Sequence, residues 1–164
     1  MPRSPAHLPG MSPQTHTPAG TPQGGQFATS PRPEAGVTLV DAPLDDTTRQ
    51  YLATALWSST GDDGEPLDAE FTIADFAPEA AAAARTDMDS FLEANADLLE
   101  QARALVPSYD DEAVAHDFWL TRNGHGAGFW DRGLGPVGDE LTKNAKPFGS
   151  VDAYVGDDGK IYLS

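Results

Sequence analysis

Hydrophobic residues that recur every three or four positions predict a helix in the middle of the chain, from Pro78 to Leu105. Pro78 suits a first helical turn, Glu79 complements the positive end of the helix dipole, and Pro107 prevents continuation. We interpret its apolar positions as one buried stripe of the core rather than a cofactor groove. The stripe consists of Met88, Phe91, Leu92, Leu98, Leu99, Ala102 and Leu105.

Shorter patterns predict further elements on both sides of this helix. Asp45 and Asp46 offer an N-cap for a helix over about 47–57, and Pro136 to Lys146 form a second one that Pro147 stops. Residues 37–40 are apolar and predict a short strand. The apolar face of the first helix consists of Leu52, Ala55 and Leu56.

Strict alternation of apolar and polar residues predicts a β-hairpin at the end of the chain, over 151–163. Asp157, Asp158 and Gly159 fit a three-residue loop in which the glycine is left-handed. In that register one face pairs Val155 with Ile161 and Ala153 with Leu163, and the other pairs Tyr154 with Tyr162.

A second hairpin is predicted over 116–131, because Asn123-Gly124 favours a type I′ turn. That register places Arg122 opposite His125 and His116 opposite Asp131. Gly126 and Gly128 would leave room for the ring of Trp119. The inner face would consist of Phe118, Leu120, Ala127 and Phe129.

Together these elements predict a single α+β domain over 37–164, a small mainly antiparallel sheet of two hairpins packed against one long acidic helix. Residues 1–36 hold 8 of the 14 prolines and 5 of the 16 glycines and lack a regular apolar period. We therefore expect a disordered tail. The tail is either a spacer or a docking peptide anchored on Phe27.

Composition narrows the function. The 164 residues include 26 Asp and Glu against 10 Lys and Arg, a net charge of -16, and no cysteine. Such a negative surface repels phosphate backbones and anionic lipids, so we expect no direct nucleic-acid binding and no membrane association. The lack of cysteine excludes thiol nucleophiles, disulfides and thiolate zinc sites. We expect no cofactor, no metal and a cytoplasmic protein.

The acidic residues are concentrated over 61–112, which has 15 of them against two arginines, a net charge of -13. This stretch is either a solvated face or a docking surface for a basic partner, with carboxylates where DNA phosphates would lie. The loop 58–68 resembles an EF-hand only superficially, because its acidic residues lack the required spacing. The candidate residues of the acidic face are Asp87, Asp89, Glu93, Asp97 and Glu100.

A second candidate site lies in the segment 116–132, where tryptophan and arginine are concentrated. These residue types dominate binding interfaces, although they also serve as packing and surface pairs. The candidates are Trp119, Arg122, Asn123, His125, Trp130, Asp131 and Arg132. Arg122, His125 and Asp131 also suggest an acid–base enzyme, and the glycines a weak anion-binding loop.

The stretches HDFWLTRNGHGAGFWDRGLG and YVGDDGKIYL resemble a family of small acidic proteins encoded by tailed double-stranded DNA phages and prophages, over about 47–164. GTPQGGQFA, at 20–28, resembles flexible tails of actinobacterial and phage proteins. The resemblance implies a phage product in the cytoplasm of the infected host, and it brings no activity, cofactor or site residue with it.

The sequence therefore favours a non-enzymatic phage accessory protein that binds a host protein, and that could inhibit a nucleic-acid-directed host factor through an acidic surface. A small enzyme around Arg122, His125 and Asp131 is one alternative. A virion-associated structural protein, with the tail as a tether, is another.

Overall fold

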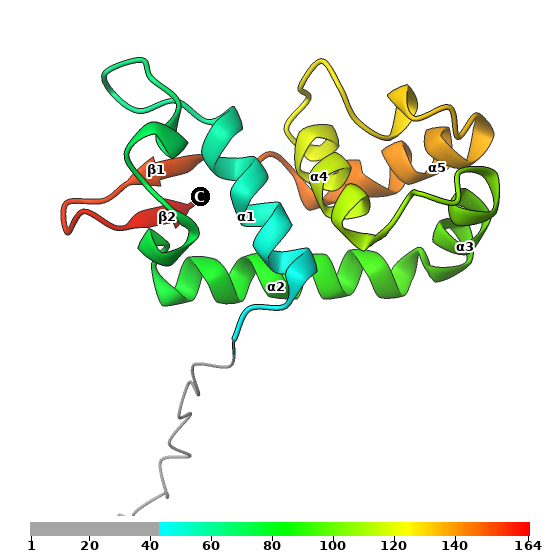
Figure 1. Ribbon diagram of the computed structural model, residues 1–164, viewed down its shortest axis with the longest axis horizontal. Coiled ribbons are helices and arrows are strands. Elements are labelled where there is room, and N and C mark those ends of the chain that lie inside the picture. Colours follow the sequence, from blue (N-terminus) through cyan, green and yellow to red (C-terminus); the bar gives the residue numbers. More distant parts are fainter. Residues whose placement is uncertain (1–42) are drawn as a thin grey trace, which may run out of the picture. The chain divides into compact units, whose positions relative to one another are not determined.

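The computed structural model describes residues 43–164, in which five α-helices and a two-stranded antiparallel sheet form an α+β fold (Figure 1). The sequence predictions for residues 1–36 and for a strand at 37–40 lie outside this range. Among the described helices, none is both long and apolar enough to cross a membrane. The helices are α1 (Asp46–Ser58), α2 (Pro78–Ala94), α3 (Ala96–Leu105), α4 (Asp111–Arg122) and α5 (Pro136–Ala145).

The prediction for α1 is confirmed. The side chain of Asp45 caps the helix by accepting a hydrogen bond of 2.8 Å from the backbone N–H of Thr48. The predicted apolar face is buried, and the helix packs against α4 and α2. That face consists of Leu52, Ala55 and Leu56.

The prediction of one long helix is wrong, because the helix divides into α2 and α3 at Asn95. Asn95 is buried and has φ and ψ of -117° and 16°, outside the helical region. Its side chain donates to the carbonyl of Phe91 at 2.8 Å and accepts from the amide of Asn144, on α5, at 2.7 Å. This buried amide interrupts the helix, and α3 packs against α5. Leu105, at the end of the predicted stripe, is exposed.

The predicted hairpin over 116–131 is also wrong, because its first half forms the end of α4. An apolar run of this length fits a buried helix as well as a buried strand. Asn123 and Gly124 end the helix instead of forming a hairpin turn, and Gly124 has the positive φ of 69° typical of that position. The helix is buried on most of its surface, through Val114, Ala115, Phe118, Trp119 and Leu120.

The C-terminal hairpin has the predicted register. Strands β1 (Ala153–Val155) and β2 (Ile161–Leu163) pair Ala153 with Leu163, Tyr154 with Tyr162 and Val155 with Ile161. Gly159 has the expected positive φ, at 75°. The predicted four-stranded sheet is wrong, since the sheet of the described region has only these two strands.

The core lies where α4 meets α1, α2 and α5, and stacked aromatic rings fill it. The ring centroids of Phe91 and Phe118 are 4.2 Å apart, and Phe129 lies 5.5 Å from Phe91. Phe148 packs edge-on against Phe118, with the two ring centroids 5.0 Å apart. Four short 3-10 helices complete the described chain: η1 (Leu67–Ala69), η2 (Ile73–Asp75), η3 (Phe129–Asp131) and η4 (Lys146–Phe148).

Candidate functional site

Arg122, a predicted site residue, lies inside the fold at the end of α4, with a side chain only 2% exposed. Its guanidinium donates to the hydroxyl of Tyr51 at 2.7 Å and to the carboxylate of Asp87 at 2.6 Å. It also donates to the carbonyls of Phe148 and Gly149, at 2.6 and 2.8 Å. These contacts join α4 to α1, α2 and η4, so Arg122 is engaged in holding the fold together.

Trp119 and Asn123 also have structural partners. Trp119 is 1% exposed, and its indole N–H donates to the hydroxyl of Ser58 at 2.7 Å. The side chain of Asn123 accepts from the N–H of Val151 at 2.8 Å and donates to the carbonyl of Trp119 at 3.0 Å. Both side chains therefore face neighbouring segments of the chain.

Arg132 belongs to a polar cluster around Asp117, which is fully buried. The carboxylate of Asp117 accepts hydrogen bonds from Tyr109 at 2.8 Å and from Nε of Arg132 at 2.8 and 3.0 Å. The hydrogen bond to Asp117 raises the pKa of Arg132. His116, predicted to pair with Asp131, instead lies 2.9 Å from Asp117. Its ring stacks on exposed Trp57, at 5.8 Å.

The remaining predicted residues of the segment 116–132 do not form a common site. His125 is half-buried and lines a hollow, whereas Trp130, 41% exposed, and Asp131 lie on the surface at η3. Of the hydrogen bonds and ion pairs in the described region, none links Arg122, His125 and Asp131. Their separate surroundings give the acid–base hypothesis no structural support.

The predicted acidic face is partly formed. Asp87 is half-buried against Arg122, whereas the other four carboxylates are exposed. We call these four the helical acidic surface: Asp89, Glu93, Asp97 and Glu100. Within residues 43–164, no group of three or more His, Asp or Glu side chains is placed to hold a metal ion.

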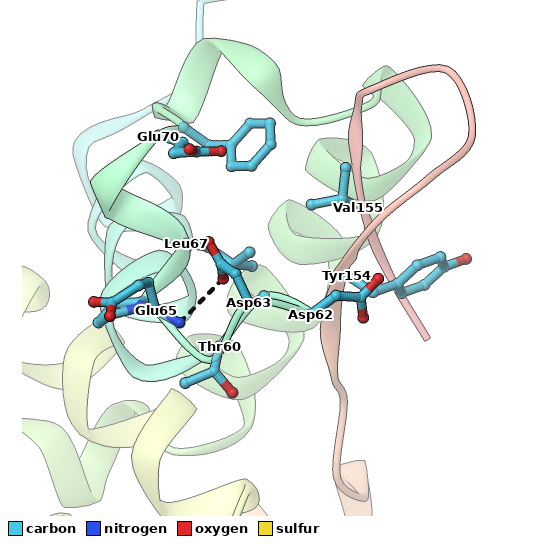
Figure 2. Close-up of a pocket in the computed structure, with 11 residues that line it drawn as sticks. Thr60, Asp62, Asp63, Glu65, Leu67, Glu70, Tyr154 and Val155 are labelled. Carbon is cyan, nitrogen blue, oxygen red and sulfur yellow. Dashed lines mark hydrogen bonds between the residues drawn. The ribbon is translucent and has the colours of Figure 1, made fainter.

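A different acidic feature, which we call the acidic pocket, lies between the loop after α1 and strand β1 (Figure 2). It encloses about 450 Å³. Figure 2 shows Glu65 and Glu70 on the side of the loop, Tyr154 and Val155 on β1, and Asp62 between the loop and Tyr154. The carboxylates belong to Asp62, Asp63, Glu65 and Glu70, and the apolar lining includes Leu67, Phe71, Tyr154 and Val155.

The loop holds its carboxylates in place through its own backbone. The N–H of Leu67 donates to the carbonyl of Ser59 at 3.0 Å, and the N–H of Gly61 donates to the carbonyl of Glu65 at 2.9 Å. Asp63 accepts from the N–H of Glu65 at 3.0 Å, drawn dashed in Figure 2. These bonds form a tight turn that presents acidic side chains at its tip.

The pocket combines unneutralised negative charge with exposed apolar surface. Neither lysine nor arginine lines it, and its four carboxylates form no ion pair within the described part of the chain. Leu67 is buried at its base and Phe71 is half-buried, whereas Tyr154 is 46% and Val155 39% exposed. A ligand that fits this surface has cationic and apolar groups side by side.

The sequence alone indicates only one side of this pocket, the acidic loop. The sequence shows the carboxylates of the loop as part of an acidic segment, but its pattern at Tyr154 and Val155 predicts only a hairpin. About ninety positions separate the two sides, so no local pattern links them. In comparisons with known proteins, the chain matches no protein-family model, no curated protein and no solved structure.

Proposed function

We propose that this protein is a non-enzymatic binding protein that holds a basic segment of a partner protein in the acidic pocket. The observation that carries the proposal is the pocket itself, in which four unpaired carboxylates surround an apolar lining. Lysine and arginine have aliphatic stems that pack on apolar surface and charged ends that reach outward. Such side chains would pack on Tyr154 and Phe71 while their charges meet the carboxylates.

The mixed character of the pocket favours a polypeptide ligand over other cationic ligands. A small inorganic cation would use the carboxylates but not Phe71, Tyr154 and Val155. A nucleic acid would bring phosphates to a surface of the same sign. A peptide in which basic and aliphatic residues alternate uses both kinds of lining at once.

The phage setting implied by the sequence resemblance extends this proposal to a host protein. Host factors that act on nucleic acids carry basic segments, because they must neutralise phosphates. Occupation of such a segment by the acidic pocket would compete with nucleic acid and inhibit the factor. The partner's identity within this class is left to the binding experiment and to capture of host proteins.

Fluorescence anisotropy with a labelled peptide that alternates lysine with valine tests the proposal. The pocket variant changes all four carboxylates to amides, as Asp62→Asn, Asp63→Asn, Glu65→Gln and Glu70→Gln. The matched control makes the same change in charge on the helical acidic surface, as Asp89→Asn, Glu93→Gln, Asp97→Asn and Glu100→Gln.

We expect the pocket variant to bind at least about tenfold more weakly and with less dependence on salt, while the control changes affinity by less than about twofold. An equal loss in both variants would mean that the peptide responds to overall charge, and it would contradict a site in the pocket. Circular dichroism establishes that both variants are folded.

A further inference from the structure

We propose that the basic segment binds as an additional β-strand along the outer edge of β1. This inference rests on the proposed function, because it specifies how the ligand lies in the same pocket. It adds a backbone component to the recognition, so that main-chain hydrogen bonds contribute affinity and alternate side chains contribute specificity.

The register of the hairpin identifies the free backbone groups. The backbones of Asp152 and Ser164 exchange two hydrogen bonds, of 2.9 and 3.1 Å, and the N–H of Gly156 donates to the backbone carbonyl of Lys160 at 2.8 Å. In an antiparallel pair, residues whose backbones bond to the partner strand alternate with residues whose backbones point away. The N–H and C=O groups of Ala153 and Val155 therefore point to the outer edge of β1.

The two edges of the hairpin differ. On the outer side of β2, the carbonyl of Ile161 accepts from the N–H of Ala77 at 2.8 Å, and Phe76 forms a parallel bridge with Ile161. On the outer side of β1, no backbone hydrogen bond to Ala153 or Val155 is formed by any residue of the described region. Among the described residues, the outer edge of β1 is therefore the one open to an additional strand.

Open space follows this free edge along its whole length. The acidic pocket lies beside Tyr154 and Val155, and a second hollow lies beside Asp152 and Ala153. Thr60, on the opposite loop, lines both. The two hollows therefore adjoin at Thr60 and together run beside 152–155, about four residues or 13 Å at about 3.3 Å per residue.

Natural sheets protect exposed edges by keeping the edge strand very short, or with lysine, proline, bulges or covering segments, and β1, with three residues, is short. The sequence of β1, Ala-Tyr-Val, has neither lysine nor proline. Its two exposed side chains and its free backbone groups are features of a strand that accepts a partner. The adjacent carboxylates select a partner strand that is basic, since an acidic strand would be repelled.

Alternation within a strand sets the chemistry of the segment. Successive side chains of an added strand point to opposite faces, so one set can meet the carboxylates while the other packs on apolar lining. The segment we propose therefore alternates basic and aliphatic residues. A slip of one residue would exchange the two faces, so the alternation determines which side chains of the segment meet the carboxylates.

Two peptide analogues test this mode without any change to the protein. Each is about eight residues long, long enough to span both hollows, and alternates lysine with valine. One is N-methylated at the lysine amides and the other at the valine amides. N-methylation removes a donor, and because alternate N–H groups point to opposite edges, only one analogue loses the donors that face β1.

We expect one analogue to bind at least about tenfold more weakly than the parent peptide and the other within about threefold of it. Equal affinities for both analogues would overturn strand addition. If the pocket variant still bound the parent peptide more weakly in that case, the proposed function would stand, but strand addition would not.

Amide hydrogen exchange of the full chain, followed by NMR, gives an independent test. The amides of Ala153 and Val155 should exchange rapidly in the free protein and at least about tenfold more slowly with peptide bound. The backbone N–H of Tyr154, which points toward β2, should be protected from exchange both with and without peptide. Protection of Val155 in the free chain would show that another segment of the protein, such as 37–40, already covers the edge, and would overturn the proposal.

Discussion

Arg122 and Asp87 bind each other: Nη1 of Arg122 lies 2.6 Å from Oδ2 of Asp87, across the interface between α4 and α2. The sequence assigned these residues to two different binding surfaces, one aromatic and one acidic. The side chain of Arg122 is buried in this pair, and that of Asp87, 37% exposed, is engaged by it. The other four residues of the predicted acidic face, Asp89, Glu93, Asp97 and Glu100, stay exposed as the helical acidic surface, and the acidic pocket lies separately beside β1.

Loss of Arg122 should destabilise the protein severely. Arg122→Met is expected to lower the free energy of unfolding by about 3–5 kcal/mol, because removal of one partner leaves buried groups without a counterpart. Arg103→Met, at a half-exposed ion pair with Asp111, should cost at most about 1 kcal/mol. Urea denaturation of both variants measures the difference. Equal losses would show that Arg122 does not hold the helices together.

Substitution of Gly128 by alanine should destabilise the protein, whereas the same substitution of Gly126 should not. A Cβ atom at Gly128 would lie 2.8 Å from the ring of Trp130 and closer still to the hydroxyl of Thr121. We expect Gly128→Ala to cost about 1–3 kcal/mol, as overpacking does elsewhere. Gly126 has no heavy atom within 4 Å of such a Cβ among those described, so Gly126→Ala should be close to neutral. Thermal unfolding of the two variants measures this difference in stability, and equal losses would contradict the prediction.

Alkaline pH should destabilise the fold through two buried tyrosines. Burial raises the pKa of Tyr51 to about 12, and burial together with the carboxylate of Asp117 raises the pKa of Tyr109. Below pH 10 both the folded and unfolded chains keep these protons, so the stabilisation is complete. Above pH 10 the unfolded chain releases them first, and stability falls by about 1.4 kcal/mol per pH unit for each tyrosine.

Urea denaturation between pH 8 and about pH 11 checks this dependence. Tyr109→Phe should lower stability at pH 8, because Asp117 loses a hydrogen bond, and should make the decline above pH 10 shallower. A decline as steep as that of the wild type would contradict the role given to Tyr109.

Asp45 should stabilise α1 at neutral pH and lose this effect in acid. Partial burial acts to raise its pKa, but hydrogen bonds from Thr48 and Arg85 outweigh that effect and lower the pKa. Its contribution is therefore present above the carboxyl's usual range and lost as the pH falls through the lowered value. Asp45→Ala should cost about 1 kcal/mol at pH 7.

Asp45→Asn serves as the matched control for the cap. It keeps a side-chain acceptor for Thr48 but removes the titration, so its stability should change less than that of the wild type as the pH falls below 4. Chemical denaturation at pH 7 and at pH 3 compares the variants. An acid dependence as steep as that of the wild type would assign the effect to other carboxylates.

The parts of the fold that the sequence predicted are those defined by local patterns. The hairpin over 151–163 followed from alternation and from the turn at Gly159, and α1 followed from its cap. The segment now in α4 was misassigned because its apolar run fits either a buried helix or a buried strand. The break at Asn95 depends on Asn144, which is distant in sequence.

The candidate site was harder to predict for the same reason. The acidic loop and β1 are far apart in sequence, and only the folded chain places Asp62 near Val155 around one pocket. The sequence also does not indicate which of the candidate side chains are exposed. Trp119 and Arg122 are of residue types common in interfaces, but tertiary contacts bury them. Residue type alone could not separate a core tryptophan from a surface one.

Chemical-shift mapping of the isotope-labelled full chain during titration with the lysine–valine peptide tests the central claim most directly. A peptide in the acidic pocket should shift the amide resonances of 60–71 and 152–156 and leave those of 89–100 nearly unchanged. Shifts concentrated at 89–100 would place the site on the helical acidic surface. Uniform small shifts, or none, would contradict a specific binding site for basic segments.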